Sequence, residues 1–487
     1  MFNLKYLPVA GIMRRYSKNK IPHLIARGVE WLLLKNTAES YSFRHEKDLR
    51  TYSSAKYKTP LYEFLGEPKF NYKIEKIFDF KTGDSVTAIE NMTLVGDVLD
   101  GELSNALDEF EELIKSGSEG FYRSDFRNED DRIRYRAGLL RRMLNWIVEK
   151  FEALVNYIKW FVFMTNREED IYEYITGRDE KEVGLFLHLM MDVDHFFNES
   201  TTHLKYRSRF DFEKVQIDYM QRLNTNHDNL IGFVAFNPAR DNCMEIIKKA
   251  IEKQGFKGVK FYPPLGYQAD HDEKYSAQIE ALLDYCTSNK VPLFTHCNNQ
   301  GFEAWPKPVH SGYHSNPKFW EAALEKHQDL ILCLGHAGGS QGWFCENKDS
   351  DKTDADTINA GDIMDETGSQ KDWNRSYASM VFKLCVKYKN VYCDASYLDD
   401  MVNKDGSFVP GPKTNFKDRL LKLFTSTPKF AKKIMYGSDW HMLFQDGINN
   451  VYFKNYKAFF EEEELKPYRD DFFYNNACKY LNLNAIS

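Results

Sequence analysis

Imidazole and carboxylate side chains recur in this sequence directly after short apolar runs. His296 stands in VPLFTHCN, His336 in LILCLGHAGG and Asp439 in IMYGSDW. Imidazole nitrogens and carboxylate oxygens are the ligands that hold a catalytic zinc, so these residue types point to metal-assisted chemistry. A histidine can also transfer protons near neutral pH, which makes general acid–base catalysis a further use for one of them.

Two basic residues accompany this set. Lys260 lies in GVKFYPP, and Arg240 follows Asn237-Pro238. Either cation could hold an anionic group of a substrate, although pairing with a surface acid is an equal interpretation for Arg240. Trp305 lies in a loop that follows another run, where aromatic residues often line a pocket; packing of the loop is the ordinary alternative.

Several polar residues near these candidates could either bind a ligand directly or hold other site residues in place. His441 follows Asp439 by two residues and could face the site or cap its loop. Asp394 and Ser396 end another apolar run and could bind a ligand or hold other site residues in place. Trp343 and Tyr313 lie in loops, like Trp305.

The elements that must position these residues are apolar runs separated by helical segments. The runs cover 185–191, 230–236, 258–262, 292–295, 330–334, 391–393 and 433–436. Helical spacing between them is clearest in 244–253, 277–289 and 319–327. Short apolar runs alternating with helices indicate parallel strands that are buried on both faces. The repetition predicts an α/β fold of the (β/α)8 TIM-barrel type, in which chemistry lies at the carboxyl ends of the strands.

The first part of the chain has a different character. Residues 95–181 show helical periodicity with many charges, and we expect a helical insertion within a single barrel domain that spans 1–487. Residues 38–84 show no clear period and remain unassigned. The loops at 299–318 and 340–373 are long, so both are candidate covers of the site, and the second is a plausible cover for the barrel mouth.

The composition argues against a nucleic-acid-binding protein and against a membrane-spanning one. The chain has 487 residues, a formal net charge of -7 and both signs of charge intermixed. A basic stripe for nucleic acid is absent, and no apolar run is long enough to span a bilayer. The 8 cysteines are scattered without a CxxC pair, which favours a reduced, cytoplasmic protein. We therefore expect a small-molecule substrate as the partner, and the sequence leaves a homo-oligomer open.

The order of the motifs resembles a known family. GVKFYPP, VPLFTHCN, LILCLGHAGG, NVYCDAS and IMYGSDW, with FFYNNACKYLNL near the end, are similar to the amidohydrolase superfamily, in particular to the amidohydrolase-related branch that includes 2-amino-3-carboxymuconate-semialdehyde decarboxylase. The resemblance runs from about residue 183 onward. It implies a barrel that holds one divalent metal, zinc with manganese as the alternative.

The resemblance also implies roles. His296 matches the metal ligand on strand five, and His336 matches the histidine on strand six that polarises the substrate. Asp439 matches the aspartate on strand eight that contacts the metal and takes a proton from its water. Lys260 matches the strand-four position, where some members carry a carboxylated lysine; in a one-metal site it would bind substrate instead.

One element of the family pattern is absent from the sequence. Its first strand carries a His-x-His pair whose two rings reach one ion, because alternate residues of a strand face the same side. None of the 13 histidines here forms such a pair, and the chain opens with MFNLKYLP, a stretch like the one that follows that strand in relatives. We expect this first strand to be missing from the sequence, which agrees with seven apolar runs where a barrel needs eight.

Three explanations stay open at this stage. The true protein begins upstream of Met1, or the chain is truncated with a crippled site, or other groups replace the pair. Asp192 and Asp194 have the right spacing for the third explanation but lie on a neighbouring strand, and His310 and His314 lie in a loop. Two protein ligands alone would hold zinc poorly, since catalytic sites normally have three.

These observations predict a metal-dependent hydrolase that acts on a C–N or C–O bond of a small molecule through a metal-activated water. Non-oxidative decarboxylation is the close alternative within the same branch. A metal-free barrel that serves as a binding or scaffold protein is the alternative of a different class.

Overall fold

The computed structural model describes residues 164, 168–179, 182–196, 211–301, 311–346, 372–403, 405–449 and 451–483. The chain divides into two compact units, 1–184 with 197–219 and 185–196 with 220–487. The described helices of the first unit include α9 (Glu168–Asp179), which begins with three acidic residues at the positive end of the helix dipole. Most of the predicted helical insertion lies outside the described residues, so that insertion and the single-domain division stay predictions.

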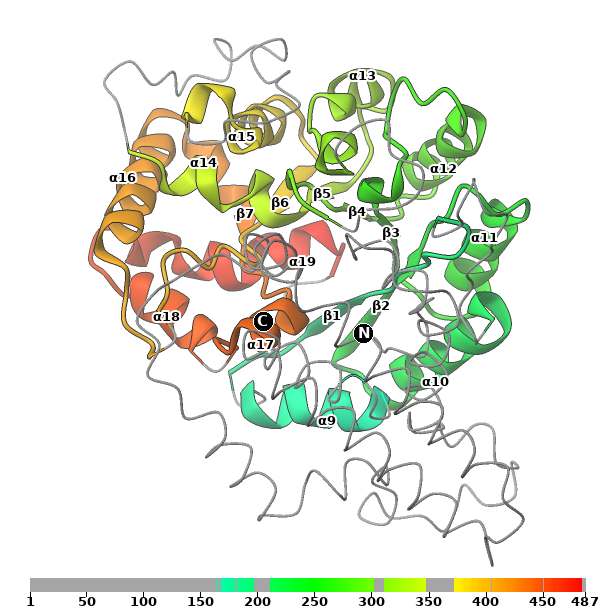
Figure 1. Ribbon diagram of the computed structural model, residues 1–487, viewed down its shortest axis with the longest axis horizontal. Coiled ribbons are helices and arrows are strands. Elements are labelled where there is room, and N and C mark those ends of the chain that lie inside the picture. The colour runs from blue at the N-terminus through cyan, green and yellow to red at the C-terminus, as the bar shows by residue number, and fades with distance from the viewer. Residues whose placement is uncertain are drawn as a thin grey trace, which may run out of the picture. The chain divides into compact units, whose positions relative to one another are not determined.

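The second unit contains a seven-stranded parallel sheet in which the strands follow one another in chain order (Figure 1). The strands are β1 (Phe186–Leu189), β2 (Leu230–Ala235), β3 (Gly258–Phe261), β4 (Leu293–Thr295), β5 (Leu332–Leu334), β6 (Val391–Asp394) and β7 (Ile434–Met435). Each of the seven predicted apolar runs contains one strand. The predicted α/β TIM-type fold is therefore confirmed, and β1 and β7 are the two edges of the sheet among the described residues.

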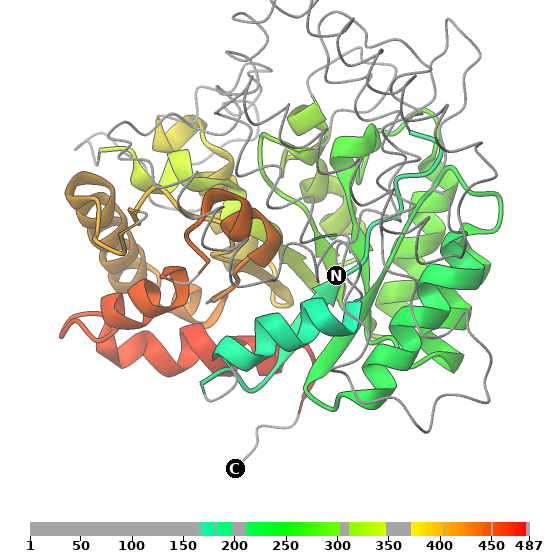
Figure 2. The same ribbon diagram turned by 60° about the horizontal axis from the view of Figure 1, so that its bottom comes forward.

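Helices connect successive strands, because a parallel pair needs a crossover rather than a hairpin. They include α11 (Cys243–Lys253), α12 (Ser276–Ser288), α13 (Phe319–Lys326), α15 (Tyr377–Lys387) and α16 (Pro410–Ser426). The first three coincide with the predicted helical segments within one or two residues. Both ribbon views show α11, α12 and α13 on the outer side of the curved sheet (Figures 1 and 2). Shorter helices are α10 (Asp218–Asn226), α14 (Ser340–Phe344), α17 (Trp440–Asp446), α18 (Tyr452–Phe459) and α19 (Asn476–Tyr480).

Burial explains why the strands read as continuous apolar runs. Every residue of β3, β4, β5 and β6 is buried. Helices cover the outer face, and side chains from neighbouring strands fill the inner face, so neither face accepts polar residues along its length. Polar residues are therefore confined to the strand ends, which is the pattern that the sequence displays.

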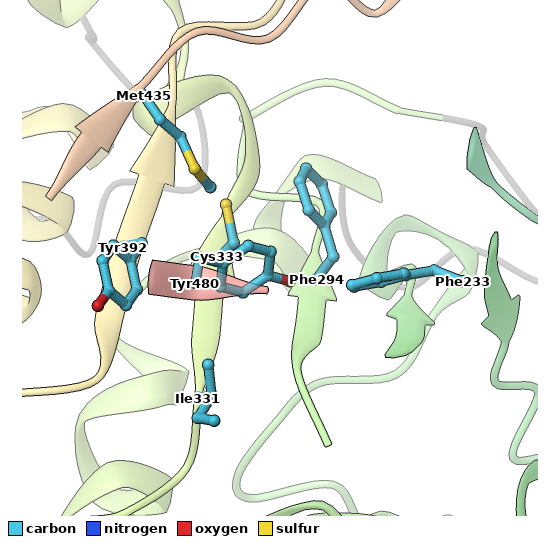
Figure 3. Close-up of a cluster of buried hydrophobic side chains, with 7 residues drawn as sticks. All are labelled: Phe233, Phe294, Ile331, Cys333, Tyr392, Met435 and Tyr480. Atoms are coloured by element: carbon cyan, nitrogen blue, oxygen red, sulfur yellow. The ribbon is translucent and has the colours of Figure 1, made fainter. Parts of the chain in front are cut away.

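The inner face of the sheet packs around one tyrosine from the last helix. Tyr480 of α19 lies in a buried cluster with Phe233, Phe294, Ile331, Cys333, Tyr392 and Met435 (Figure 3). Its side chain is 1% exposed. The closing helix thus supplies a large side chain to the interior of the barrel sheet, a contribution made from outside the strands.

Among the described residues, no helix has both the length and the apolar character that crossing a bilayer requires.

Candidate active site at the strand ends

The residues singled out from the sequence follow β4, β5 and β7 at one rim of the sheet. His296 comes directly after the last residue of β4, and His336 is the second residue after β5. Asp439 lies between β7 and α17, directly before that helix. The backbones of His336 and Asp439 are left-handed, with φ of 59° and 51°. That conformation is costly for residues other than glycine, and such strain concentrates where side chains must be aimed at a site.

His296 and His336 meet side by side. Nδ1 of His296 lies 3.0 Å from Nε2 of His336, and the two ring centroids are 4.6 Å apart. The outer nitrogens face carbonyl oxygens: Nε2 of His296 lies 2.8 Å from the oxygen of Gln300, and Nδ1 of His336 lies 3.0 Å from the oxygen of Ser396. The two rings therefore form a chain between two backbone acceptors.

The two histidine rings make three hydrogen-bond contacts, whereas two neutral rings have only two N–H groups to donate. Each neutral imidazole carries a single N–H, whereas the contacts to Gln300, between the rings and to Ser396 each need a hydrogen. Burial, together with the charges of His336 and Lys260, holds the pKa of His296 well below its ordinary value. The His296 ring therefore contributes a single N–H to these contacts.

Asp394 and Ser396 fix the orientation of His336. The backbone N–H of His336 donates to Oδ1 of Asp394 at 2.8 Å, and the hydroxyl of Ser396 donates to the same oxygen at 2.7 Å. Burial raises the pKa of Asp394, an effect that these hydrogen bonds oppose. A Cβ at Gly437 would lie 2.7 Å from Oδ2 of this carboxylate. The indirect role proposed for Asp394 and Ser396 is the one that the contacts support.

Asp439 lies in a positive environment. Its Oδ1 is 3.2 Å from Nδ1 of His441. Burial would raise the pKa of Asp439, but His441, His336 and Lys260 outweigh it and hold that pKa below the ordinary value. The carboxylate therefore stays ionised at neutral pH and is available to a cation or to a proton.

Lys260 is the buried cation of this rim. Its ammonium lies 4.4 Å from the centre of the Phe294 ring and 5.7 Å from that of Tyr262. Burial lowers the pKa of Lys260 to about 8, an effect that Asp439 and Asp394 partly oppose. The ammonium is thus charged at neutral pH and close to losing its proton, as suits a group that meets a substrate anion.

The donor chemistry at this rim suits a divalent metal, but the number of ligands falls short. His296 and Asp439 are ligands of the kind zinc prefers. Among the described residues, however, three or more ligand atoms of His, Cys, Asp or Glu lie within 4.8 Å of one another only at Glu280, Asp284 and His327, away from this rim. His296 and Asp439 alone do not complete a three-ligand site, as the absent His-x-His pair leads one to expect.

Arg240 is engaged by two carboxylates. Its terminal nitrogen donates to Asp192 at 3.0 Å and to Asp194 at 3.1 Å, and its Nε also reaches Asp192. The side chain of Asp192 is only 2% exposed. The acids that Arg240 holds are buried strand-end residues rather than the surface acid considered from the sequence. Asp192 and Asp194 therefore both accept hydrogen bonds from the guanidinium of Arg240.

Other candidates lie elsewhere or outside the described residues. Trp305 and His310 belong to residues that the structure does not describe, as do 302–310 and 347–371 of the two candidate covers. Trp343 is fully buried, and its indole donates to the oxygen of Ala337 at 2.8 Å. Packing, the ordinary interpretation, accounts for this tryptophan.

Sequence reasoning missed two contributors to the rim. The carbonyl of Gln300 is an acceptor for His296, but a backbone oxygen leaves no mark in the residue types. Tyr397, next to Ser396, has a left-handed backbone with φ of 52° and donates to Asp446 at 2.6 Å. At His336, Asp439 and Tyr397 the left-handed backbone falls on residues other than glycine, so composition gives no signal for these three positions.

Comparison with known families identifies part of this unit. Residues 214–354 match the family model of the amidohydrolases. This segment includes Lys260, His296 and His336, and its match to the amidohydrolase model agrees with the resemblance seen in the motifs. The match does not distinguish the decarboxylase-like branch from others. No curated protein matches the chain.

Solved structures show distant similarities. An amidohydrolase from Burkholderia multivorans with bound HEPES is 10% identical, with a TM-score of 0.40 over 67% of this chain and 92% of that one. Dihydroorotase from Saccharomyces cerevisiae in complex with 5-fluoroorotic acid is 13% identical, with a TM-score of 0.37 over 64% and 80%. The 4-oxalomesaconate hydratase of Rhodopseudomonas palustris is 12% identical, with a TM-score of 0.33 over 56% and 71%. None of these similarities is close enough to carry a function over.

Proposed function

We propose that this protein is an amidohydrolase-type hydrolase that cleaves a C–N or C–O bond of a small molecule at the carboxyl ends of the strands. The observation that carries the proposal is that His296, His336, Asp439 and Lys260 lie at the carboxyl ends of strands of one sheet, where their charges shift the pKa values of His296 and Asp439. A cytoplasmic enzyme of this kind would meet its substrate as a free small molecule.

The proposed reaction needs a divalent ion, zinc with manganese as the alternative. His296 and Asp439 are the ligands that the described residues offer for it, and the set is complete only with further ligands. When bound, such an ion supplies a water acidified to near neutral pH.

The described side chains divide the remaining work. Asp439, ionised beside His441, accepts the proton of the attacking water. His336, whose orientation Asp394 fixes, exchanges its Nε2 contact with His296 for a hydrogen bond to the oxygen on which negative charge develops. The ammonium of Lys260 holds an anionic group of the substrate against Tyr262 and Phe294. Arg240, engaged by Asp192 and Asp194, keeps the ends of β1 and β2 in place rather than binding substrate.

One observation favours a second function. His296 uses both ring nitrogens within the protein, and Lys260 places a cation among the acids of the same rim. Such an arrangement needs no metal, and it suits a barrel that binds a small anion without hydrolysing it. In this alternative, Lys260 and His336 bind the ligand and Asp439 has no catalytic role.

Hydrolysis of a panel of lactones, cyclic amides and ring imides that carry a carboxylate tests the proposal. The full chain is assayed after chelation, and again after zinc or manganese is restored. We expect turnover only with metal, and its loss in Asp439→Asn and in His336→Gln. Binding of panel members without turnover, at equal strength with and without metal, would contradict hydrolysis and favour the metal-free barrel.

A further inference from the structure

Two acids and a histidine meet on the outer helical layer, away from the strand-end rim. Glu280 and Asp284 are four residues apart on α12, so both project from one face of that helix. His327 follows α13 directly as its C-cap. One ligand atom of each of the three residues lies within 4.8 Å of the others.

The histidine of this cluster is buried, and one of its ring nitrogens lacks a hydrogen bond. His327 is 5% exposed, and its Nε2 makes no hydrogen bond to any described residue. Nε2 lies 3.3 Å from a Glu280 oxygen, and Nδ1 lies 3.7 Å from an Asp284 oxygen. A buried ring nitrogen without a hydrogen bond is unfavourable, and this one faces the Glu280 carboxylate while the other ring nitrogen faces that of Asp284. A cation bound between these groups would remove that cost.

The backbone around His327 adds to the preference for a cation. The residue stands at the carboxyl end of α13, where unpaired carbonyls give the helix its partial negative charge. Its own N–H donates to Ala323 at 2.9 Å, and its carbonyl accepts from Leu330 at 3.0 Å, so the ring is held on a fixed backbone. Ligands on rigid elements keep their geometry better than ligands on loops.

Lys326 is the present counterion. Its ammonium forms an ion pair with Glu280, and this hydrogen bond is the main cause of the raised pKa of Lys326. The side chain of Lys326 is 63% exposed, which leaves it free to swing into solvent. An exposed pair of this kind contributes little free energy, so a multivalent ion can displace it.

We propose that His327, Glu280 and Asp284 form a binding site for one zinc-like divalent ion, separate from the barrel rim. One imidazole nitrogen and two carboxylate oxygens are a ligand set that zinc accepts. Asp284 is exposed, so water completes the coordination from the solvent side. The ion joins α12 to the end of α13 and thereby braces the helices that follow β3 and β4, which carry Lys260 and His296.

Cobalt(II) tests this site, because its visible spectrum reports tetrahedral coordination by nitrogen and oxygen. The chelated full-length protein is titrated with cobalt and then with zinc as a competitor. We expect a saturable visible band that zinc abolishes. In His327→Gln and Glu280→Gln, binding should weaken at least about tenfold, while circular dichroism reports whether each variant is folded.

Two further variants separate this site from the rim. His296→Gln should leave the cobalt band of the outer site unchanged, whereas loss of the band in His296→Gln but not in His327→Gln would assign the ion to the rim and overturn the proposal. Lys326→Met removes the competing cation, and cobalt should bind about fivefold more tightly. Equal or weaker binding by Lys326→Met would also contradict the site, whatever the hydrolase assay shows.

Discussion

Nε2 of His336 lies 3.0 Å from Nδ1 of His296, across the carboxyl ends of two adjacent strands. This contact joins the two histidines that the motif resemblance assigns to different tasks, metal binding and substrate polarisation. A substitution at either ring therefore changes the hydrogen bonds of the other, and their effects should not add. The clearest tests of the site act on the residues that surround this pair.

Asp394 should act by positioning His336. In Asp394→Asn, one acceptor of the His336 N–H and the Ser396 hydroxyl is replaced by a neutral amide. We expect kcat to fall about 10- to 100-fold with KM nearly unchanged, as for other residues that orient a catalytic group. Steady-state kinetics on the substrate found in the panel measures this. A rise in KM with kcat unchanged would assign Asp394 to substrate binding instead.

Lys260 should make the stability of the protein depend on alkaline pH. Burial lowers its pKa from 10.5 to about 8. Between these values the unfolded chain holds a proton that the folded chain has lost, so the free energy of unfolding rises as pH increases through this window. The rise approaches about 3 kcal/mol by the usual conversion of pKa shifts.

Urea unfolding at pH 7 and pH 10 measures this effect. The rise should be missing from Lys260→Met, which should also be more stable than the natural protein at pH 7, because its fold no longer buries an ammonium. Equal dependence on pH in both proteins would mean that Lys260 is not the buried cation described above.

Lys260 should also set the alkaline limit of substrate binding. An anionic substrate loses its partner when the ammonium gives up its proton, so KM should rise as pH passes about 8, while kcat follows other groups. KM is measured over a series of pH values for anionic and for uncharged members of the panel, and only the anionic members should show the rise. A rise in KM for both members alike would contradict the anchoring role.

Arg240 should contribute more to stability than to catalysis. Arg240→Met leaves Asp192 and Asp194 without their guanidinium, and Asp192 is almost entirely buried. Loss of one partner from a buried ion pair costs about 3 kcal/mol. Urea unfolding should show this loss, and Asp192→Asn introduced into Arg240→Met should restore part of it. If Arg240→Met has normal stability but a greatly raised KM, the result would contradict a structural role and show that Arg240 binds substrate.

Tyr480 offers a test of the barrel interior. Its hydroxyl is buried without a hydrogen bond to any described residue, while its ring packs between strands (Figure 3). Tyr480→Phe removes the unsatisfied group and should leave stability unchanged or raise it by about 1 kcal/mol. Tyr480→Ala leaves a cavity and should cost about 3–5 kcal/mol. Thermal and urea unfolding of the two variants measure the difference, and a large loss in Tyr480→Phe would reveal a hidden partner.

The barrel could be predicted because its strands are buried on both faces. β3 to β6 are buried along their length, so each appears as a mainly apolar run with its polar residues at or next to the carboxyl end, which marks the rim. His296, His336 and Asp439 were found by that rule together with the motif resemblance. The same rule gives no information about partners, which is why the engagement of Arg240 by two buried acids was not foreseen.

What could not be predicted depends on backbone geometry and on contacts distant in sequence. The left-handed conformations of His336 and Asp439 are uncommon for any residue other than glycine, so the sequence does not mark where they occur. The contact of His336 with Ser396 joins residues 60 positions apart. Tyr480 fills the barrel interior from a helix, where strand periodicity gives no signal. These features follow from how elements distant in sequence pack together rather than from local preference.

The rate of hydrolysis by Asp439→Asn, with metal restored and folding verified by circular dichroism, tests the central claim most directly. Asparagine keeps the shape of the side chain but cannot accept a proton. The account predicts a fall in kcat of at least about 1,000-fold at pH 7 on the substrate that the natural protein turns over. A rate within a few fold of the natural protein would contradict the claim that catalysis takes place where His296, His336 and Asp439 meet.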